Sequence, residues 1–263
     1  MTHTLYQVDA FTDEPFKGNP AVVCLLAGPE PDVWMQKLAA EMNLSETAFL
    51  LPGEVGWDLR WFTPQTEDDL CGHATLASAK VLFENQPILR NDLIKFHTRS
   101  GDLLARWVDG KVELDFPVLR FEPMDADSDW VEALGFQPVG SVYSGDYVLF
   151  EAEYAQTIYS AQPNMAALKK LPMPEVIITA ESDRSEYDFI SRFFAPQLGI
   201  DEDPVTGSAH CLLAPYWAEK MGKLTFDAYQ ASQRGGRLTV KIMDDRVRIM
   251  GAAQFIFKAE LLF

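Results

Sequence analysis

Two segments of this chain, 132 to 135 residues apart, carry nearly the same sequence. The first reads R-W-F-T-P-Q from Arg60 and then C-G-H-A-T from Cys71. The second reads R-F-F-A-P-Q from Arg192 and then T-G-S-A-H from Thr206. Because matching motifs follow one another in the same order, we expect two related structural units within one chain. Two copies are too few for a stacked solenoid, so the repeat predicts a pseudo-symmetric pair of lobes.

The repeat continues downstream, where each copy contains a hairpin sequence. The pattern G-x-L-x-A before Asp109–Gly110 matches G-x-L-x-V before Asp244–Asp245, and Asp-Gly is a strong signal for a tight turn. Apolar segments with few helix-breaking residues predict a helix at residues 71–84 in the first copy and at 207–221 in the second. Each lobe is therefore predicted to be a mixed β-sheet wrapped around one central helix, which makes the fold α/β.

The two copies set the predicted domain boundaries. A polar, proline-containing stretch from residue 117 to about 128 separates them. We predict an N-terminal lobe at residues 1–117 and a C-terminal lobe at 118–250, with a last strand within 251–263 returning to complete the first lobe. Near the N-terminus, Pro20 stands where a helix could begin, because the missing N–H of proline costs nothing at the first helical position.

Composition restricts the partners and the compartment. The formal net charge of −17 argues against binding to nucleic acid or to an anionic membrane surface. The longest apolar run, residues 21–27, is too short to cross a membrane, and the N-terminus shows no secretory signal. Three cysteines are an odd number, which argues against a disulfide framework and for a reducing cytoplasm. We therefore expect a cytoplasmic protein with a small-molecule partner.

Both predicted central helices begin with small residues, Cys71-Gly72-His73-Ala74 in one copy and Thr206-Gly207-Ser208-Ala209 in the other. Glycine at a helix start lets backbone N–H groups approach a ligand, and the helix dipole favours an anion there. Two such ends facing each other across a pseudo-two-fold axis would bind a carboxylate. The alternative is that the small residues only allow close packing of the helix on the sheet.

Four motifs resemble the phenazine-biosynthesis isomerase (PhzF-like) family. They are D-A-F-T-x-x-P-F-x-G-N-P-A from Asp9, S-E-T-A-F from Ser45, C-G-H-A-T from Cys71 and E-D-P-V-T-G-S-A from Glu202, in the order of the family. The resemblance covers residues 5–240. It implies the diaminopimelate-epimerase fold, in which two α/β lobes each fold a sheet around a central helix and the active site lies in the cleft. It also implies a homodimer.

Glu46 is the first candidate for acid–base catalysis. The same offset in the second copy falls on Ile178, so a single carboxylate would break the symmetry, as a one-base proton shuttle requires. The resemblance implies that this glutamate takes a proton from one substrate carbon and returns it to another. Burial between the lobes is expected to raise its pKa toward neutrality. The alternative is a surface glutamate that caps a helix together with Ser45.

The resemblance implies substrate-binding roles for further residues in both copies. His73 would bind the substrate and relay protons with Glu46, and Asp203 would hydrogen-bond an amino or hydroxyl group of the substrate. Purely structural roles remain open, because a lone histidine is often buried and hydrogen-bonded, and an Asp-Pro pair suits a turn. Positions that would shape the pocket and bind the substrate carboxylate are Asn19, Gly72, Gly207 and Ser208.

Cys71 leaves a second chemistry open. Epimerases of this fold use two opposed cysteines, and Cys71 stands at the first of those positions while Thr206 occupies the second. A threonine hydroxyl cannot act as a comparable thiolate, which argues against a two-thiol racemase. One cysteine opposed by threonine is seen in hydroxyproline dehydratases of the same fold. Cys71 would then belong to the substrate site, and a buried structural thiol is the remaining alternative.

The remaining motifs argue for chemistry without a cofactor. The sequence contains neither a dinucleotide-binding G-x-G-x-x-G after a strand nor a Walker loop, and its four histidines lack metal-ligand spacing. The predicted function is a cofactor-independent isomerase that moves a proton on a small carboxylate-bearing substrate. The alternatives are a hydroxy-amino-acid dehydratase or epimerase that uses Cys71, and a non-catalytic small-molecule binding protein.

Overall fold

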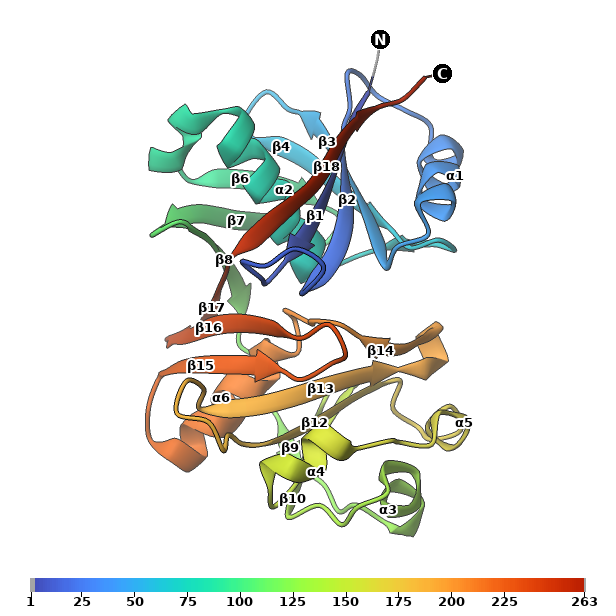
Figure 1. Cartoon of the computed structure of the whole chain (residues 1–263), viewed down its shortest axis with the longest axis vertical. Helices are drawn as coiled ribbons and strands as arrows, with labels where there is room; N and C mark the ends of the chain where they lie inside the picture. Colours follow the sequence, from blue (N-terminus) through green and yellow to red (C-terminus); the bar gives the residue numbers. More distant parts are fainter. Residues whose placement is uncertain (1–2, 263) are drawn as a thin grey trace. The chain divides into compact units, whose positions relative to one another are not determined.

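The structure, a computed structural model, describes residues 3–262 and divides into two units (Figure 1). Unit 1 contains the residues up to Phe116 and those from Arg248 onward, and unit 2 runs from Pro117 to Val247. The sequence analysis predicted divisions after residue 117 and after residue 250, whereas the units divide after Phe116 and after Val247. Within the described residues, no helix has the length and apolar character needed to cross a membrane.

Unit 1 contains a mixed sheet. Its strands are β1 (Thr4–Ala10), β2 (Asn19–Leu25), β3 (Glu46–Pro52), β4 (Trp57–Phe62), β5 (Glu67–Asp68), β6 (Ile94–Thr98), β7 (Gly101–Val108), β8 (Lys111–Pro117) and β18 (Ala253–Glu260). They pair in the order β18-β1-β2-β3-β4-β6-β7-β8. The β2–β3 and β4–β6 pairs are parallel and the others are antiparallel, and β5 pairs antiparallel with β4. The C-terminal strand β18 thus pairs with β1 in the sheet of unit 1.

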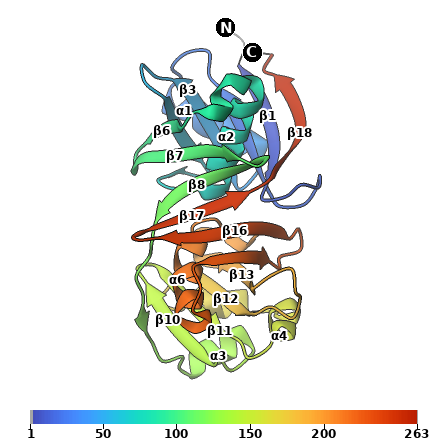
Figure 2. The same ribbon diagram turned by 90° about the vertical axis from the view of Figure 1, so that its left-hand side faces the viewer.

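Helix α2 (Gly72–Asn85) is the central helix of unit 1, and almost all of its residues are buried. Figures 1 and 2 show it within the curve of the strands. After Gly72 the helix contains no glycine or proline, and its many alanines favour helix and allow close packing. Helix α1 (Asp32–Met42) covers the other face of the sheet, where Met35 and Leu38 pack against Phe49. A 3-10 helix, η1 (Pro87–Asn91), follows α2.

Unit 2 repeats this arrangement. Its strands are β9 (Glu122–Pro123), β10 (Gly140–Ser144), β11 (Tyr147–Glu151), β12 (Glu175–Glu181), β13 (Phe189–Ala195), β14 (Ile200–Asp203), β15 (Thr225–Gln230), β16 (Gly236–Met243) and β17 (Arg246–Gly251), the last of which continues into unit 1. They pair in the order β9-β10-β11-β12-β13-β15-β16, with β11–β12 and β13–β15 parallel. The same alternation of parallel and antiparallel pairs therefore occurs in both units, which confirms the pseudo-symmetric α/β fold.

The helices of unit 2 cover both faces of its sheet. Helix α6 (His210–Met221) packs on one face. The other face is covered by α3 (Ser128–Leu134), α4 (Ala155–Ser160) and α5 (Met165–Leu168). Figure 1 shows α4 in front of the strands and α6 behind them. A 3-10 helix, η2 (Pro196–Leu198), joins β13 to β14.

The expected helix start at Pro20 is wrong. Pro20 is the second residue of β2, a strand that lies between β1 and β3. The apolar run that follows it is buried on both faces of the sheet, and a strand covered on both faces shows a continuous apolar pattern. Proline is tolerated at the beginning of such a strand.

The helix predicted from residue 207 begins three residues later, at His210. The residues before it form a turn in which the backbone N–H of His210 donates to the carbonyl of Gly207. The imidazole Nδ1 of His210 lies 2.9 Å from the carbonyl oxygen of Thr206. Because the imidazole bonds to this carbonyl oxygen, the oxygen does not accept the backbone N–H of His210, as it would in a regular first helical turn. Gly207 and Ser208 therefore lie in a turn and not at a helix start.

Candidate active site

Glu46 is the first residue of β3 and is only 4% exposed. Phe49 of the same strand packs against α1. Since successive side chains of a strand point to opposite faces, Glu46 points to the face that α2 covers. A buried carboxyl group on a strand cannot be a surface helix cap, so that alternative for Glu46 is wrong.

Polar groups from three elements meet directly beside Glu46. The hydroxyl of Ser45 donates to Oδ1 of Asn19 at 3.2 Å and lies 3.3 Å from Nε2 of His73. Asn19 begins β2, and His73 is the second residue of α2. Because β2 and β3 are parallel, their first residues lie at the same edge of the sheet. The structure thus brings Asn19, Ser45 and His73 together within unit 1, and Glu46 directly follows Ser45 in the chain.

Cys71 contacts the other nitrogen of the His73 ring. Its sulfur lies 3.4 Å from Nδ1 of His73, so both ring nitrogens have a partner within unit 1. Cys71 is also the N-cap residue of α2, and its carbonyl accepts from the hydroxyl of Thr75 at 2.5 Å. Gly72 follows as the first helical residue, where backbone N–H groups are not used by the helix itself.

Asp203 ends β14 and is 6% exposed. Its Oδ2 accepts a hydrogen bond from the hydroxyl of Thr206, which shows that it stabilises the turn before α6. The fully buried amide of Gln230 closes the same turn, because its Oε1 accepts from the N–H of Thr206 at 2.8 Å and its Nε2 donates to the carbonyl of Asp203 at 2.8 Å. The sequence analysis missed Gln230, since neither copy of the repeat marks this position.

Ser208 is positioned by an aromatic hydroxyl. Tyr147, the first residue of β11, donates its hydroxyl hydrogen to Oγ of Ser208 at 3.1 Å. Gly207 precedes Ser208 in the same turn and is buried. Within unit 2, the predicted residues Asp203, Gly207 and Ser208 therefore lie in one short turn next to the first residue of β11.

The strand register changes the predicted counterpart of Glu46. In unit 1, Arg60 pairs with Phe49. In unit 2, Arg192, which matches Arg60 in the sequence repeat, pairs with Ile178. Ile178 is therefore the counterpart of Phe49, and the prediction that it corresponds to Glu46 is wrong.

The true counterpart of Glu46 is Glu175. Glu46 stands three residues before Phe49, and Glu175 stands three residues before Ile178. Each glutamate is the first residue of its strand, β3 in one unit and β12 in the other. Each also lies beside a parallel strand, with Glu46 next to Ala21 of β2 and Glu175 next to Tyr147 of β11. Glu175 is half-buried. The acidic residue is thus present in both copies.

A family model described as "Phenazine biosynthesis-like protein" (PhzC-PhzF) matches residues 8–259. The chain belongs to this family. An uncharacterized isomerase of Halalkalibacterium halodurans is 49% identical over 100% of this chain and 99% of its own length. An uncharacterized isomerase of Pseudomonas aeruginosa is 46% identical over 97% of each chain. The chain is therefore an enzyme of the isomerase class in the PhzC-PhzF family.

Solved structures place the PhzC-PhzF fold in a wider group. The crystal structure of a PhzF family phenazine biosynthesis protein from Enterococcus faecalis matches with a TM-score of 0.95 at 42% identity and covers 100% of both chains. A probable proline racemase from Agrobacterium radiobacter matches with a TM-score of 0.65 at 12% identity, covering 100% of this chain and 93% of its own. The second likeness shows the fold alone, and it confirms the predicted racemase and epimerase type of fold.

Both halves of the PhzC-PhzF chain contain the same ion pair, which the sequence analysis missed. In unit 1, the Nε of Arg60 donates to Glu67 at 2.7 Å, and in unit 2 the Nε of Arg192 donates to Glu202 at 2.7 Å. A second guanidinium nitrogen bonds the other carboxylate oxygen in each case. The signal was present, since Glu67 and Glu202 are 135 residues apart, the same offset as the motifs that follow them.

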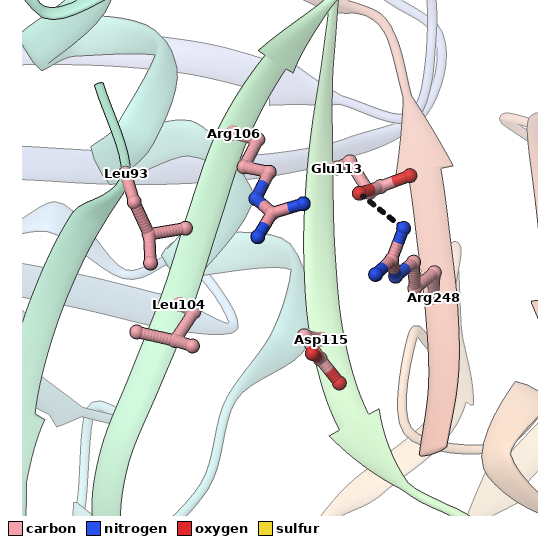
Figure 3. A pocket seen from close by; sticks show the side chains of 6 residues that line it. All are labelled: Leu93, Leu104, Arg106, Glu113, Asp115 and Arg248. Atoms are coloured by element: carbon pink, nitrogen blue, oxygen red, sulfur yellow. Dashed lines mark ion pairs between the residues drawn. The ribbon is translucent and has the colours of Figure 1, made fainter. Parts of the chain in front are cut away.

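Two other features carry no site. Among residues 3–262, no group of three or more His, Cys, Asp or Glu side chains could hold a metal ion. Figure 3 shows a hollow on β7, β8 and β17, where Arg106 and Arg248 flank Glu113. Arg248 lies 3.7 Å from Glu113, and the hollow measures about 10 Å³. It has room for at most one water molecule. None of the predicted site residues lines it.

Proposed function

We propose that this isomerase moves a proton between two carbons of a small carboxylate-bearing substrate without a cofactor, and that Glu46 is its single acid–base group. The observation that carries the proposal is the buried position of Glu46 beside the Asn19–Ser45–His73 hydrogen bonds. A carboxyl group removed from water at a polar strand end is suited to proton transfer.

The chemistry needs a carboxyl group that can both accept and donate a proton. In the forward step the Glu46 carboxylate takes a proton from a substrate C–H, and the bonding electrons move into the adjacent unsaturated system. In the second step the Glu46 carboxylic acid, whose proton exchanges with the solvent, donates a proton to another carbon. Glu46 thus ends as the carboxylate with which it began.

The substrate carboxylate would be bound by backbone N–H groups and by His73. Gly72 begins α2, where the free N–H groups and the helix dipole favour an anion. Its lack of a side chain allows a ligand to approach the backbone. His73 would donate a ring N–H to the substrate in exchange for its present contact with Ser45 or Cys71. Asp203, Gly207 and Ser208 of unit 2 keep the substrate-binding role proposed for them from the sequence.

A second reaction is favoured by one contact. The 3.4 Å distance between the Cys71 sulfur and Nδ1 of His73 allows the imidazole to take the thiol proton, which would produce a nucleophilic or basic thiolate. Cys71 would then be the base of a hydroxy-amino-acid dehydratase or epimerase. The other candidate is a small-molecule binding protein in which Glu46 only accepts a hydrogen bond.

The test is proton NMR in D₂O with small amino and hydroxy carboxylates, including 3-hydroxyproline and a dihydro-hydroxyanthranilate. Deuterium should enter a C–H position with the wild type and with Glu54→Gln, an exposed control, and should not enter with Glu46→Gln. Full exchange by Glu46→Gln would refute the proposal. Loss of exchange in Cys71→Ser alone would support the dehydratase or epimerase. Binding of a compound without any exchange would support the binding protein.

A further inference from the structure

Unit 1 has a cavity of about 210 Å³ on the face of its sheet that α1 covers. Phe49 and Leu51 of β3 line this cavity, together with Asp58 and Arg60 of β4. Arg60 is the register partner of Phe49, and Asp58 is the register partner of Leu51. Directly paired residues of neighbouring strands point to the same side of a sheet. Because Glu46 points to the opposite face, which α2 covers, the cavity is separate from the candidate active site.

The inner wall of the cavity is apolar. It is formed by Leu26, Met35 and Phe49, which are buried members of one hydrophobic cluster between the sheet and α1. Pro29 and Leu51 add apolar surface nearer the solvent. An apolar cavity of about 150 Å³ is large enough to bind benzene. The cavity of unit 1 therefore has room for one six-membered ring with a short side chain.

Two carboxylates, Glu30 and Asp58, stand at the rim of the cavity. Oε1 of Glu30 lies 2.8 Å from Nε2 of His3, while Nδ1 of His3 accepts the backbone N–H of Ala27 at 3.1 Å. A ring nitrogen that accepts a hydrogen bond carries no proton, so His3 is a neutral donor and does not cancel the charge of Glu30. In the described part of the chain, no Lys or Arg side chain forms an ion pair with Glu30 or Asp58.

Arg60, the cationic residue of the rim, is already bound by two other carboxylates. Its guanidinium donates to both oxygens of Glu67 and to Oδ1 of Asp32, at distances of 2.7 to 2.8 Å. These ion pairs compensate the charge of Arg60, so the charges of Glu30 and Asp58 leave the rim negative. An organic cation therefore fits the cavity, whereas the carboxylate substrate proposed for the active site does not.

We propose that this cavity binds a small primary amine in its ammonium form. The ring or short chain of the amine would lie on the apolar wall, and its ammonium group would donate to the carboxylates of Glu30 and Asp58. Hydrogen bonds between an ammonium group and a carboxylate are strengthened by the opposite charges. All residues of this amine site belong to unit 1. The proposal adds a second ligand site and does not depend on the proposed function of Glu46.

The test is NMR of protein labelled with ¹³C-methyl methionine. Of the nine methionines, Met35 lines the cavity, and Met35→Leu assigns its signal. The probe is phenethylammonium, and 2-phenylethanol and 3-phenylpropanoate are its neutral and anionic analogues of similar size. Phenethylammonium should shift the Met35 signal to saturation, with a dissociation constant about tenfold below that of the alcohol. The anionic analogue should leave the Met35 signal unchanged.

Removal of the rim charges should weaken binding of the ammonium but not of the alcohol. Asp58→Asn and Glu30→Gln should each raise the dissociation constant of phenethylammonium about threefold, and together about tenfold, as expected for ion pairs in contact with water. The dissociation constant of 2-phenylethanol should change by less than about twofold. The matched control is Glu54→Gln, an exposed carboxylate between β3 and β4 that does not line the cavity, and it should leave both constants unchanged.

Three results would overturn the proposal. The first is equal affinity for the ammonium and the alcohol, and the second is unchanged ammonium affinity in the variant that lacks both rim charges. The third is a Met35 signal that does not shift with phenethylammonium at concentrations up to about 10 mM, where even weak specific binding saturates.

Discussion

His210 is the residue whose ionisation should affect stability most clearly. It is completely buried at the start of α6, and burial lowers its pKa from 6.5 to about 4, although its bond to the Thr206 carbonyl opposes this shift. Below pH 6.5 the unfolded chain binds a proton that the folded chain excludes until about pH 4. The free energy of unfolding should therefore fall by about 2 kcal/mol between pH 7.5 and pH 5 from this group.

Urea denaturation of the wild type and of His210→Asn at both pH values measures this contribution. Carboxylates titrate in both proteins, so the difference between the two pH dependences isolates the imidazole. The wild type should lose more stability on acidification than the variant. Equal losses of stability in the two proteins would show that His210 does not remain neutral in the folded state.

At the residue scale, the motifs predicted which side chains gather but not how the copies correspond. Cys71, His73 and Glu46 stood in recognisable motifs, and in unit 1 the structure joins His73 to Cys71 and to Ser45, the residue before Glu46. Glu175 was missed because the connection from β12 to β13 is three residues longer than that from β3 to β4. A fixed sequence offset fails across such an insertion, and only the strand register reveals the pair.

At the scale of elements, the paired Arg–Glu ion pairs stabilise the hairpins that lead into the two site turns. Arg60 of β4 binds Glu67 of β5, and Arg192 of β13 binds Glu202 of β14. The second pair is the more enclosed, since its side chains are 13% and 23% exposed. Arg192 also donates to the carbonyls of Ile158 and Ala161, so it ties β13 to the end of α4.

Arg192→Met should destabilise the protein by about 3 kcal/mol, because it leaves a partly buried carboxylate and two carbonyls without their donor. Lys95→Met is the matched control. Lys95 pairs with Asp102 in an exposed position, with side chains 41% and 48% exposed, and its removal should cost less than about 1 kcal/mol. Urea unfolding of both variants measures the difference. Similar losses for the two would contradict the special role of Arg192.

Element prediction succeeded where local signals agreed. The Asp109–Gly110 turn joins β7 and β8 as expected, with Asp109 and Gly110 both at positive φ. The long segment without breakers became α2. The strand β2 could not be predicted locally, because Pro20 becomes part of a strand only through pairing with β1 and β3. The start of α6 was misplaced because the sequence pattern does not show that the imidazole of His210 bonds to the Thr206 carbonyl.

At the scale of the whole molecule, the sequence repeat predicted the topology better than any single motif. The same order of parallel and antiparallel pairs occurs in each unit, and each unit encloses one apolar helix. A duplicated sequence implies duplicated hydrophobic faces, and these can be buried only by the same arrangement of strands. The C-terminal strand returns to unit 1 because β1 has an open edge that β18 covers.

The family resemblance also leads us to propose a homodimer, and the charge of the chain makes the proposal testable. Each chain carries a net charge of −17, so two chains repel each other unless salt screens them. Analytical ultracentrifugation at 0.3 M salt should give a mass near twice 29.6 kDa. Lowering the salt to 0.02 M should raise the dissociation constant of the dimer. Uncharged ligands should not change this dependence on salt. A mass of 29.6 kDa at every salt and protein concentration would contradict the dimer.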